Sequence, residues 1–471
     1  MKLFSYLLAI IALSASANIA QAQSLQEIYE LALNNDAQLK AYRAQFKADQ
    51  EQAIIARSAL LPRVSASYDY SETETTTIAN SLVGLDESGG GVIREIESFS
   101  DTTAKGYVVS LNQALFDLPA WFSFQSTRAL SDRAEATFAA QQQDLIVRVA
   151  QAYFGVLRAE DNLAASQAQE RALARQLEQT QQRFEVGLIA LTDVHEAQAV
   201  FDLARVARLT DENNLAVALE GLSVLTNVDH DRLSTLSETF PITPPEPADR
   251  AAWVDFALAN NLELKAARLG EDAAQQNSRS KTFEHMPKIS GSFSTSDFST
   301  EGISEQESVF NVPPRSERDQ DIVRLRVEVP LFAGGSISAN RRRAAEQFNA
   351  SKEQRIGLQR NTIAQTRSLH MTVQSDVARV KARAQSIVSS QSALEATQAG
   401  YEVGTRNVVD VLNAQNALYT AQRDYANTRY DYVINQLRLK QKAGLLSPAD
   451  IVELDAFLEA PGPVTQSQQG L

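Results

Sequence analysis

The chain consists of two similar halves, and this internal duplication limits its fold more than any other feature. The motif FEVG at 184–187 returns as YEVG at 401–404, and LNN at 33–35 returns as ANN at 259–261. A proline-rich segment, 241–247, lies near the joint. The repeats predict a first structural repeat at 23–240 and a second at 241–446, which follow a predicted signal peptide at 1–22 and precede a C-terminal segment and tail at 447–471.

Each half contains two segments in which apolar and polar residues alternate, which is typical of β-strands. They predict β-hairpins at about 62–116 and 287–332. Each segment is roughly ten residues long, enough to cross a bilayer as a tilted strand. The polar connections, about 72–102 and 299–320, are expected to be long external loops. The apolar faces include Val64, Ala66, Tyr68 and Tyr70 in the first segment and Val323, Leu325, Val327, Val329 and Leu331 in the fourth.

Four strands are too few to close a barrel, which needs about eight. An open strand edge in lipid would leave backbone groups without hydrogen-bond partners. If the sheet is in a membrane, copies of the chain must therefore share one barrel, with eight strands from two copies or twelve from three. The same alternation also fits a soluble antiparallel sheet with one wet face, although the export signal and the strand lengths favour the membrane.

The rest of the sequence predicts very long helices. No proline occurs between residues 120 and 240 or between 331 and 447, and both stretches are rich in strong helix formers. The segment 121–186 alone would extend for roughly 100 Å. Gly187 and Gly404 follow the long helices in the position that glycine favours. Helices of this length indicate a coiled coil or a tube of helices; the strands argue against a plain intracellular coiled coil.

The first residues predict export from the cytoplasm. Lys2 precedes an apolar run, and Ala20 and Ala22 form an A-x-A cleavage signal. The chain has no cysteine, so neither a disulfide nor a lipid-modified N-terminus is expected. Its formal net charge of −14 argues against nucleic acid as a partner, because phosphate binding needs a basic surface.

No catalytic motif is present. Neither a phosphate-binding loop nor a nucleophile or zinc-protease motif occurs, and the histidines do not have metal-ligand spacing. We therefore expect no enzyme activity, no cofactor and no metal site. The four scattered histidines are His195, His230, His285 and His370.

Two segments resemble the helix–turn–helix tips of the TolC-like family of outer-membrane ducts. They are 176–194 and 399–412, and 426–437 resembles the return helix of that family. The segments 115–121 and 329–335 resemble its junctions between strands and helices. The similarity extends over nearly all of the chain after the signal peptide.

This resemblance implies an α+β membrane protein that forms a homotrimer. Four transmembrane strands per protomer would build a twelve-stranded barrel in the lipid of the outer membrane. A long α-helical barrel would continue it into the periplasm. A mixed α/β equatorial domain would include the C-terminal equatorial segment at 447–471. The family is a passive exit duct for tripartite efflux pumps, including multidrug export, and for type I secretion. Its partners are a periplasmic adaptor (membrane fusion) protein and an inner-membrane transporter of the RND, ABC or MFS class.

Two other classes of protein are alternatives to an exit duct. A solute-specific porin would need more strands per chain and no long helices. A periplasmic coiled-coil scaffold or adaptor would lack the four amphipathic strands. The sequence does not identify the transporter, the adaptor or the substrates, and it does not decide between efflux and secretion.

The resemblance also implies a gate at the periplasmic end. Tyr401 and Arg406 on the second tip would face Asp193, Thr192 and Gln176 on the first. An arginine offers several donors to a carboxylate and a tyrosine offers one. Contacts of this kind contribute about 1 kcal/mol each when partly wet. A few of them per protomer could hold the tips together and still break when a partner binds.

A constriction and a docking surface are expected at the same tips. Asp410 would form a ring of carboxylates, while Asn413 stands where the family pattern has a second aspartate, so the preference for cations should be weaker. The resemblance places adaptor docking at Val186, Gly187 and Leu188 on the first tip and at Val403, Gly404 and Thr405 on the second.

Overall fold

The computed structural model describes residues 23–306 and 315–459, which form two compact units. The predicted signal peptide and the last residues of the predicted tail lie outside the described part. Helices α3, α4, α7 and α8 continue from one unit into the other. Unit 1 comprises the described residues within Met1–Phe46, Ala134–Ala267 and Gln354–Leu471, and unit 2 those within Lys47–Arg133 and Arg268–Glu353.

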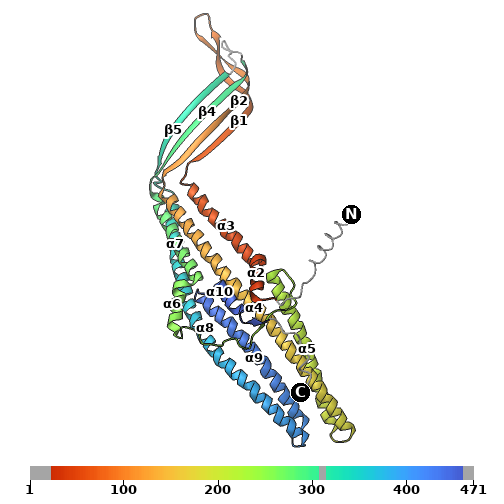
Figure 1. The fold of residues 1–471 in the computed structure, drawn as a ribbon. Coiled ribbons are helices and arrows are strands. Elements are labelled where there is room, and N and C mark those ends of the chain that lie inside the picture. Colours follow the sequence, from red (N-terminus) through yellow and green to blue (C-terminus); the bar gives the residue numbers. More distant parts are fainter. Residues whose placement is uncertain (1–22, 307–314, 460–471) are drawn as a thin grey trace, which may run out of the picture. The chain divides into compact units, whose positions relative to one another are not determined.

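Unit 2 contains one antiparallel sheet in the order β1-β2-β4-β5 (Figure 1). The central pair, β2 and β4, joins the hairpin of the first half to the hairpin of the second. Residues directly opposite each other in neighbouring strands point to the same face. Its strands are β1 (Arg63–Leu85), β2 (Gly91–Phe116), β4 (Lys288–Gln306) and β5 (Arg315–Glu328).

The strands extend well beyond the ten residues expected. β1 has 23 residues and β2 has 26, so most of 72–102 is paired strand and not loop. Threonine-rich sequence explains the difference, because Thr75, Thr76 and Thr77 are β-branched and continue the ladder with Ser100, Phe99 and Ser98. The loop prediction is therefore wrong there, as it is for much of 299–320; residues 307–314 lie outside the described part.

The helices of unit 2 pack beside the strand ends. The rings of Phe122 and Phe283 stack with centroids 5.2 Å apart, and the Ser280 hydroxyl donates to the Pro119 carbonyl at 2.8 Å. These contacts join the start of α4 to the end of α7 and the short turn η1. The elements are the end of α3 (Ala37–Ser58), the start of α4 (Leu118–Glu185), the end of α7 (Leu262–Thr282), η1 (Phe283–His285) and the start of α8 (Ser336–Glu402).

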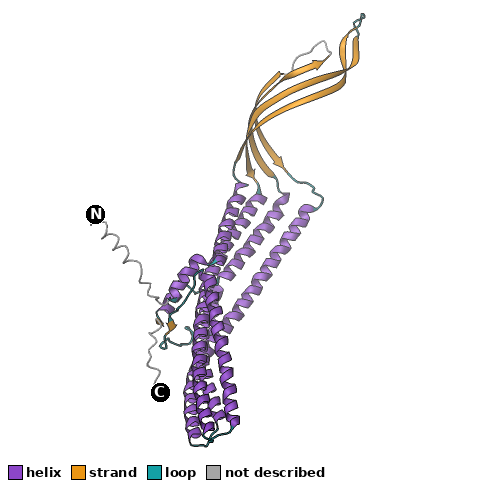
Figure 2. Ribbon diagram, turned by 90° about the vertical axis from the view of Figure 1, so that its right-hand side faces the viewer, coloured by secondary structure: helices purple, strands orange, loops and turns teal. Residues whose placement is uncertain are grey.

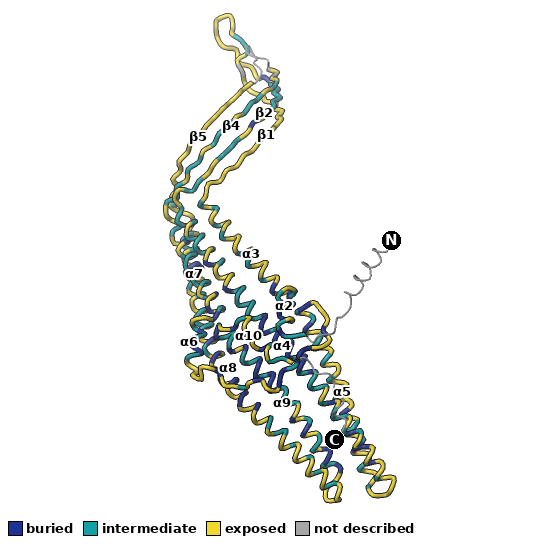
Figure 3. Tube along the Cα trace, viewed as in Figure 1, coloured by how far each residue is buried: buried dark blue, intermediate teal, exposed yellow. Residues whose placement is uncertain are grey.

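Unit 1 is predominantly helical and contains the main apolar core (Figure 2, Figure 3). Tyr153 and Phe154 of α4 are fully buried against Leu222, Tyr432 and Ile28. With α4 at 68 residues and α8 at 67, the prediction of very long helices is confirmed. The further elements are α2 (Leu25–Asn35), α5 (Leu191–Thr226), β3 (Thr235–Leu236), α6 (Arg250–Asn260), α9 (Val408–Lys442), α10 (Pro448–Asp455) and β6 (Leu458–Glu459).

Equivalent caps begin α3 and α7. The Asp36 carboxylate accepts from the Leu39 backbone N–H at 2.8 Å, and the Asn261 side-chain oxygen accepts from the Leu264 N–H at the same distance. Gly444 has φ +74° and packs against the Asn260 carbonyl, which a Cβ there would approach to 2.4 Å. Among the helices that the structure describes, none is long and apolar enough to cross a membrane.

Candidate functional site at the helical tips

The first tip is the turn between α4 and α5. Gly187 adopts φ +79°, a left-handed conformation that glycine accepts without strain. Its N–H donates to the Phe184 carbonyl at 2.8 Å, and the Leu188 N–H donates to the Arg183 carbonyl at 2.9 Å. These bonds satisfy carbonyls left free by the end of α4, so the chain reverses within a few residues.

The second tip, between α8 and α9, is built in the same way. Gly404 adopts φ +80°, and the Thr405 N–H donates to the Gly400 carbonyl at 2.9 Å. Asn407 then caps α9, because its side-chain oxygen accepts from the Asp410 N–H at 2.8 Å. The predicted positions of both glycines are confirmed by these turns.

Apolar side chains at both tips are open to solvent. Val186 is 69% exposed, Leu188 72% and Val403 76%. Gly187, Gly404 and Thr405 are exposed as well. Large apolar side chains that stay exposed together indicate a surface that another molecule covers.

A small apolar cluster packs between the helices next to the two tips. Leu173 and Leu177 of α4 are buried against Ala197 of α5 and against Val408 and Leu412 of α9. The cluster is much smaller than the core of unit 1. Little apolar burial therefore stabilises the tips. Each polar contact there contributes a large share of the local stability.

Tyr401 lies beside the first tip. The Arg183 guanidinium carbon is 4.5 Å from the centre of its ring, a cation–π contact that the sequence did not predict. The Tyr401 hydroxyl and the Gln176 side-chain nitrogen are both buried without a hydrogen-bond partner in the described structure. A cavity of about 540 Å³ opens beside them, lined by Gln176, Gln179, Gln182, Arg183, Val186, Gln398, Tyr401 and Glu402.

Arg406 lies in the turn before α9 and contacts that helix within the protomer. Its Nη1 lies 3.7 Å from Asp410 Oδ2, a long i,i+4 ion pair with an arginine side chain that is 61% exposed. Thr192 is exposed and Asp193 is half-buried near the start of α5. Within one copy, the described hydrogen bonds and ion pairs do not join Tyr401 or Arg406 to these two residues. The predicted gate contacts therefore remain a prediction.

Asp410 and Asn413 lie on the same side of the first turns of α9, since residues three apart face the same way. The side chain of Asp410 is 37% exposed and Asn413 is exposed. A carboxylate in the first turn is favoured by the helix dipole, so Asp410 has a structural reason to be there as well.

An acidic pair that the sequence did not single out lies in the middle of unit 1. Burial, and to a smaller extent the charge of Asp161, raise the pKa of Glu160 to about 7. Burial also raises the pKa of Asp161, although the Tyr430 hydroxyl, which donates to it at 2.6 Å, acts in the opposite direction. Only their burial distinguishes these two acids from the many acidic residues on helix surfaces. Because burial depends on the fold, the sequence alone could not single them out.

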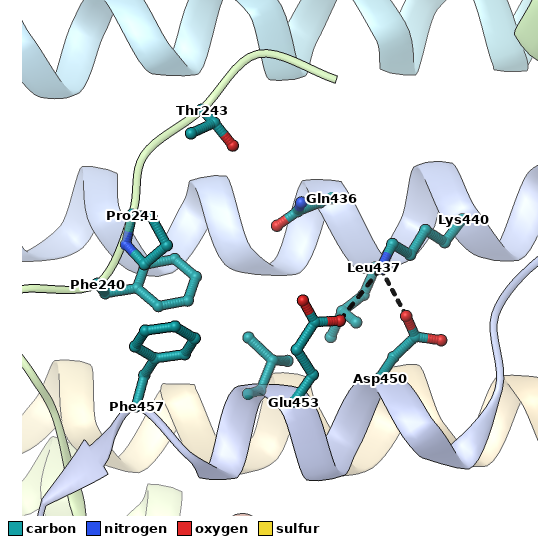
Figure 4. Close-up of a pocket in the computed structure, with 10 residues that line it drawn as sticks. Phe240, Pro241, Thr243, Gln436, Leu437, Lys440, Asp450, Glu453 and Phe457 are labelled. Carbon is teal, nitrogen blue, oxygen red and sulfur yellow. Dashed lines mark hydrogen bonds and ion pairs between the residues drawn. The ribbon is translucent and has the colours of Figure 1, made fainter. Parts of the chain in front are cut away.

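A second pocket, of about 100 Å³, lies between α9 and α10 (Figure 4). The Lys440 ammonium at its edge is 2.6 Å from Asp450 and 4.0 Å from Glu453. The rings of Phe240 and Phe457 meet edge to face at 5.4 Å. Its charged groups are thus already paired, so the pocket is a structural joint. Within the described ranges, no group of His, Asp and Glu could hold a metal ion.

A family model described as "Outer membrane efflux protein" matches residues 28–228 and 253–445. The outer membrane protein TolC of Vibrio cholerae is 33% identical over 450 residues, which cover 95% of this chain and 97% of that one. The alkaline protease secretion protein AprF of Pseudomonas aeruginosa is 30% identical, over 92% of this chain and 86% of that one.

The fold also matches solved structures of outer-membrane channels. The structure of CusC, described as a transmembrane channel, aligns with a TM-score of 0.71 at 17% identity over 90% of this chain and 92% of that one. The VceC outer membrane protein of Vibrio cholerae aligns with a TM-score of 0.66 over 89% and 96%. At these identities the likeness concerns the fold alone.

Proposed function

The chain belongs to the outer membrane efflux protein family, and from this we propose that it is the passive, trimeric exit duct of a cell-envelope pump. The family consists of outer-membrane channel proteins and not of enzymes. The proposed duct would take its energy from an inner-membrane transporter.

The sheet of unit 2 carries the proposal. Its outer strands, β1 and β5, each have one edge that pairs with no other strand among the residues that the structure describes. The apolar face is open, with Val64 68% exposed and Val323 82% exposed. Edges in lipid must be paired and an apolar face there must meet acyl chains. Three copies joined edge to edge would satisfy both needs with a twelve-stranded barrel.

We propose that the tips are the periplasmic gate. Their polar contacts are few, and the apolar side chains of Val186, Leu188 and Val403 would be covered when an adaptor docks. Docking would then favour a wider arrangement of the tips. Tyr401 and Arg406 would hold the closed arrangement against the first tip, within one copy or between neighbouring copies.

Asp410 would set the charge preference of the mouth. Three copies around one axis would bring three carboxylates to one height, which favours cations in a narrow aqueous passage. Asn413, about one turn further on, adds hydrogen bonding but no charge. Asp410→Asn should therefore reduce cation selectivity and Asn413→Asp should increase it, both measured as reversal potentials across a salt gradient.

The experiment that tests the duct combines mass and conductance. The detergent-solubilised protein should have the mass of a trimer and conduct ions in a planar bilayer. Tyr401→Phe combined with Arg406→Ser should raise the conductance of that trimer. A conducting monomer would refute the shared barrel, whereas an intact trimer of unchanged conductance would refute only the gate.

Type I secretion is a second role that a specific similarity favours. AprF of Pseudomonas aeruginosa and PrtF of Dickeya chrysanthemi are named as protease secretion proteins, and this chain is 30% and 28% identical to them over nearly its whole length. Crosslinking in cells followed by affinity capture of this chain should recover an ABC transporter if secretion is a role. An RND or MFS transporter as the sole inner-membrane partner would argue for efflux alone.

A further inference from the structure

Three arginines gather on the polar face of the sheet, close to its helical end. Arg63 of β1 lies opposite Asn112, which in turn lies opposite Ser292, and Ser292 lies opposite Arg324. Arg63 and Arg324 thus belong to one row across all four strands, on the same face. Arg326 points to that face one step nearer the helices, opposite Ser290. We call Arg63, Arg324 and Arg326 the arginine patch.

The positive charge of this patch is not neutralised locally. All three side chains are exposed, and among the described residues none of the three guanidinium groups forms an ion pair. Glu328, the carboxylate nearest along β5, is opposite Lys288. A chain with a formal net charge of −14 therefore carries a locally basic surface on this face.

The next residues along this face of β1, β2 and β4 are small and polar, and Ile322 of β5 completes their row. Ser65 and Ser110 are opposite each other with their hydroxyl oxygens 2.8 Å apart, and Ser294 follows opposite Ser110. A carboxylate returns on this face of β1 only at Asp69, six residues beyond Arg63, or roughly 20 Å along the strand. Between Arg63 and Asp69, this face of the sheet offers guanidinium and hydroxyl donors without a competing carboxylate.

We propose that the arginine patch forms an inner girdle that binds polyvalent anions, such as polyphosphates or polycarboxylates, inside the barrel. The inference rests on the proposed trimeric barrel, in which the apolar face meets lipid and this polar face lines the lumen. Three copies would place nine guanidinium groups around one aqueous passage. Arg324 and Arg326 are about 7 Å apart along β5, a spacing that one polyanion can span.

The chemistry of the side chain favours this ligand class. A guanidinium group presents planar pairs of donors that match carboxylate and phosphate oxygens. A single exposed contact of this kind is weak and is screened by salt. Several contacts around one passage act on the same multivalent ion, so their effects combine. The girdle would thus oppose the cation preference proposed for the Asp410 ring.

The test uses the purified full-length trimer in a planar bilayer, with tripolyphosphate as the probe. Tripolyphosphate added on the barrel side should block the wild-type conductance, and the block should weaken as the KCl concentration rises. Arg324→Ser combined with Arg326→Ser should raise the half-blocking concentration by about tenfold, the effect of about 1.4 kcal/mol. The matched control is Arg94→Ser, which removes an exposed arginine of β2 opposite Ser81, far along the hairpin.

The outcomes separate the girdle from the duct. Block of the wild type that the double variant weakens and Arg94→Ser leaves unchanged supports the girdle. If the wild-type trimer conducts ions but tripolyphosphate does not block it, the girdle proposal is wrong. Equal block of the wild type and the double variant would also overturn the proposal. A chain that neither trimerises nor conducts overturns the proposed duct, and the girdle with it.

Discussion

Unit 1 and the sheet of unit 2 place their apolar residues in opposite ways. In unit 1, Tyr153, Phe154 and Tyr432 are completely buried within the chain. In the sheet, Val323 is 82% exposed and Tyr68 is 68% exposed. Figure 3 shows the difference, with buried residues concentrated in the helices and exposed ones along the strands. One protomer thus completes the core of unit 1 but leaves the apolar face of the sheet for other molecules to cover.

The difference explains why the sequence pattern of the two regions differs. A helix that is buried on several sides needs apolar residues around much of its circumference, as α4 has between Leu145 and Leu157. A strand between lipid and water alternates strictly between apolar and polar residues. Its apolar side chains become buried only after the strand is inserted into the membrane. Unit 1 should therefore respond to mutation as a soluble protein does, and the sheet as a membrane protein does.

The most severe expected outcome, loss of the whole assembly, comes from a charge on the apolar face of the sheet. In the proposed barrel, Val323→Arg would put a guanidinium group against acyl chains in each of three copies, at a cost of about 2–4 kcal/mol per copy. We expect loss of the proposed trimer from outer-membrane fractions, measured by crosslinking, electrophoresis and immunoblotting.

The neighbouring position gives a matched control. Ile322 precedes Val323 on β5 and lies opposite Ser294, so it points to the polar face. Ile322→Arg introduces the same charge at the same depth and should leave the trimer in place. Equal loss of the trimer in both variants would mean that the two faces do not meet different solvents.

The next effect is the loss of a core ring in unit 1. Phe154 is fully buried, with Tyr153 5.6 Å and Tyr430 5.7 Å away between ring centres. Phe154→Ala should lower the free energy of unfolding by about 3–5 kcal/mol per chain, because a cavity remains. Thermal unfolding followed by circular dichroism would measure it. Tyr68→Ala, on the exposed face of β1, should change the midpoint far less; similar shifts would contradict the contrast between the regions.

The sequence predicted the regular parts well and the contacts between distant segments poorly. The ends of α4 and α8 were evident because Gly187 and Gly404 follow long runs without proline. The sequence does not predict the extension of β1, because the threonines after Ser71 are as polar as loop residues, although they are also β-branched. The contact between Arg183 and Tyr401 lay beyond prediction, since it depends on how the ends of α4 and α8 pack.

That contact leads to a smaller effect at the tips, where burial is slight. Removing the guanidinium group with Arg183→Ala should loosen the tip by about 0.5–1 kcal/mol, the size of a partly exposed cation–π contact. The channel should then show a higher open fraction in bilayer recordings. Arg175→Ala, about two turns earlier on the same helix, is the control and should leave it unchanged. A higher open fraction in both variants would point to a general loss of charge.

The smallest effect concerns pH and the acidic pair of unit 1. The pKa of Glu160 is raised by burial to about 7, from the ordinary 4.5. Between these values the folded chain keeps a proton that the unfolded chain releases, so Glu160 favours folding more as the pH falls from 8 towards 5. His230 acts in the opposite direction, because burial lowers its pKa and the unfolded imidazole takes up a proton first. The pH profile of the wild type alone therefore mixes two opposite contributions.

A neutral substitute isolates the part due to Glu160. Glu160→Gln resembles the protonated acid, so it should be more stable than the wild type at pH 8, by about 1 kcal/mol or less, and equal to it near pH 5. Thermal midpoints of both proteins at the two pH values give the comparison. Glu178→Gln, on the exposed side of the same helix, should show no such difference between the two pH values. If Glu160→Gln were less stable than the wild type at pH 8, the Glu160 carboxylate would be stabilised by a charge partner, and burial would not be what controls its pKa.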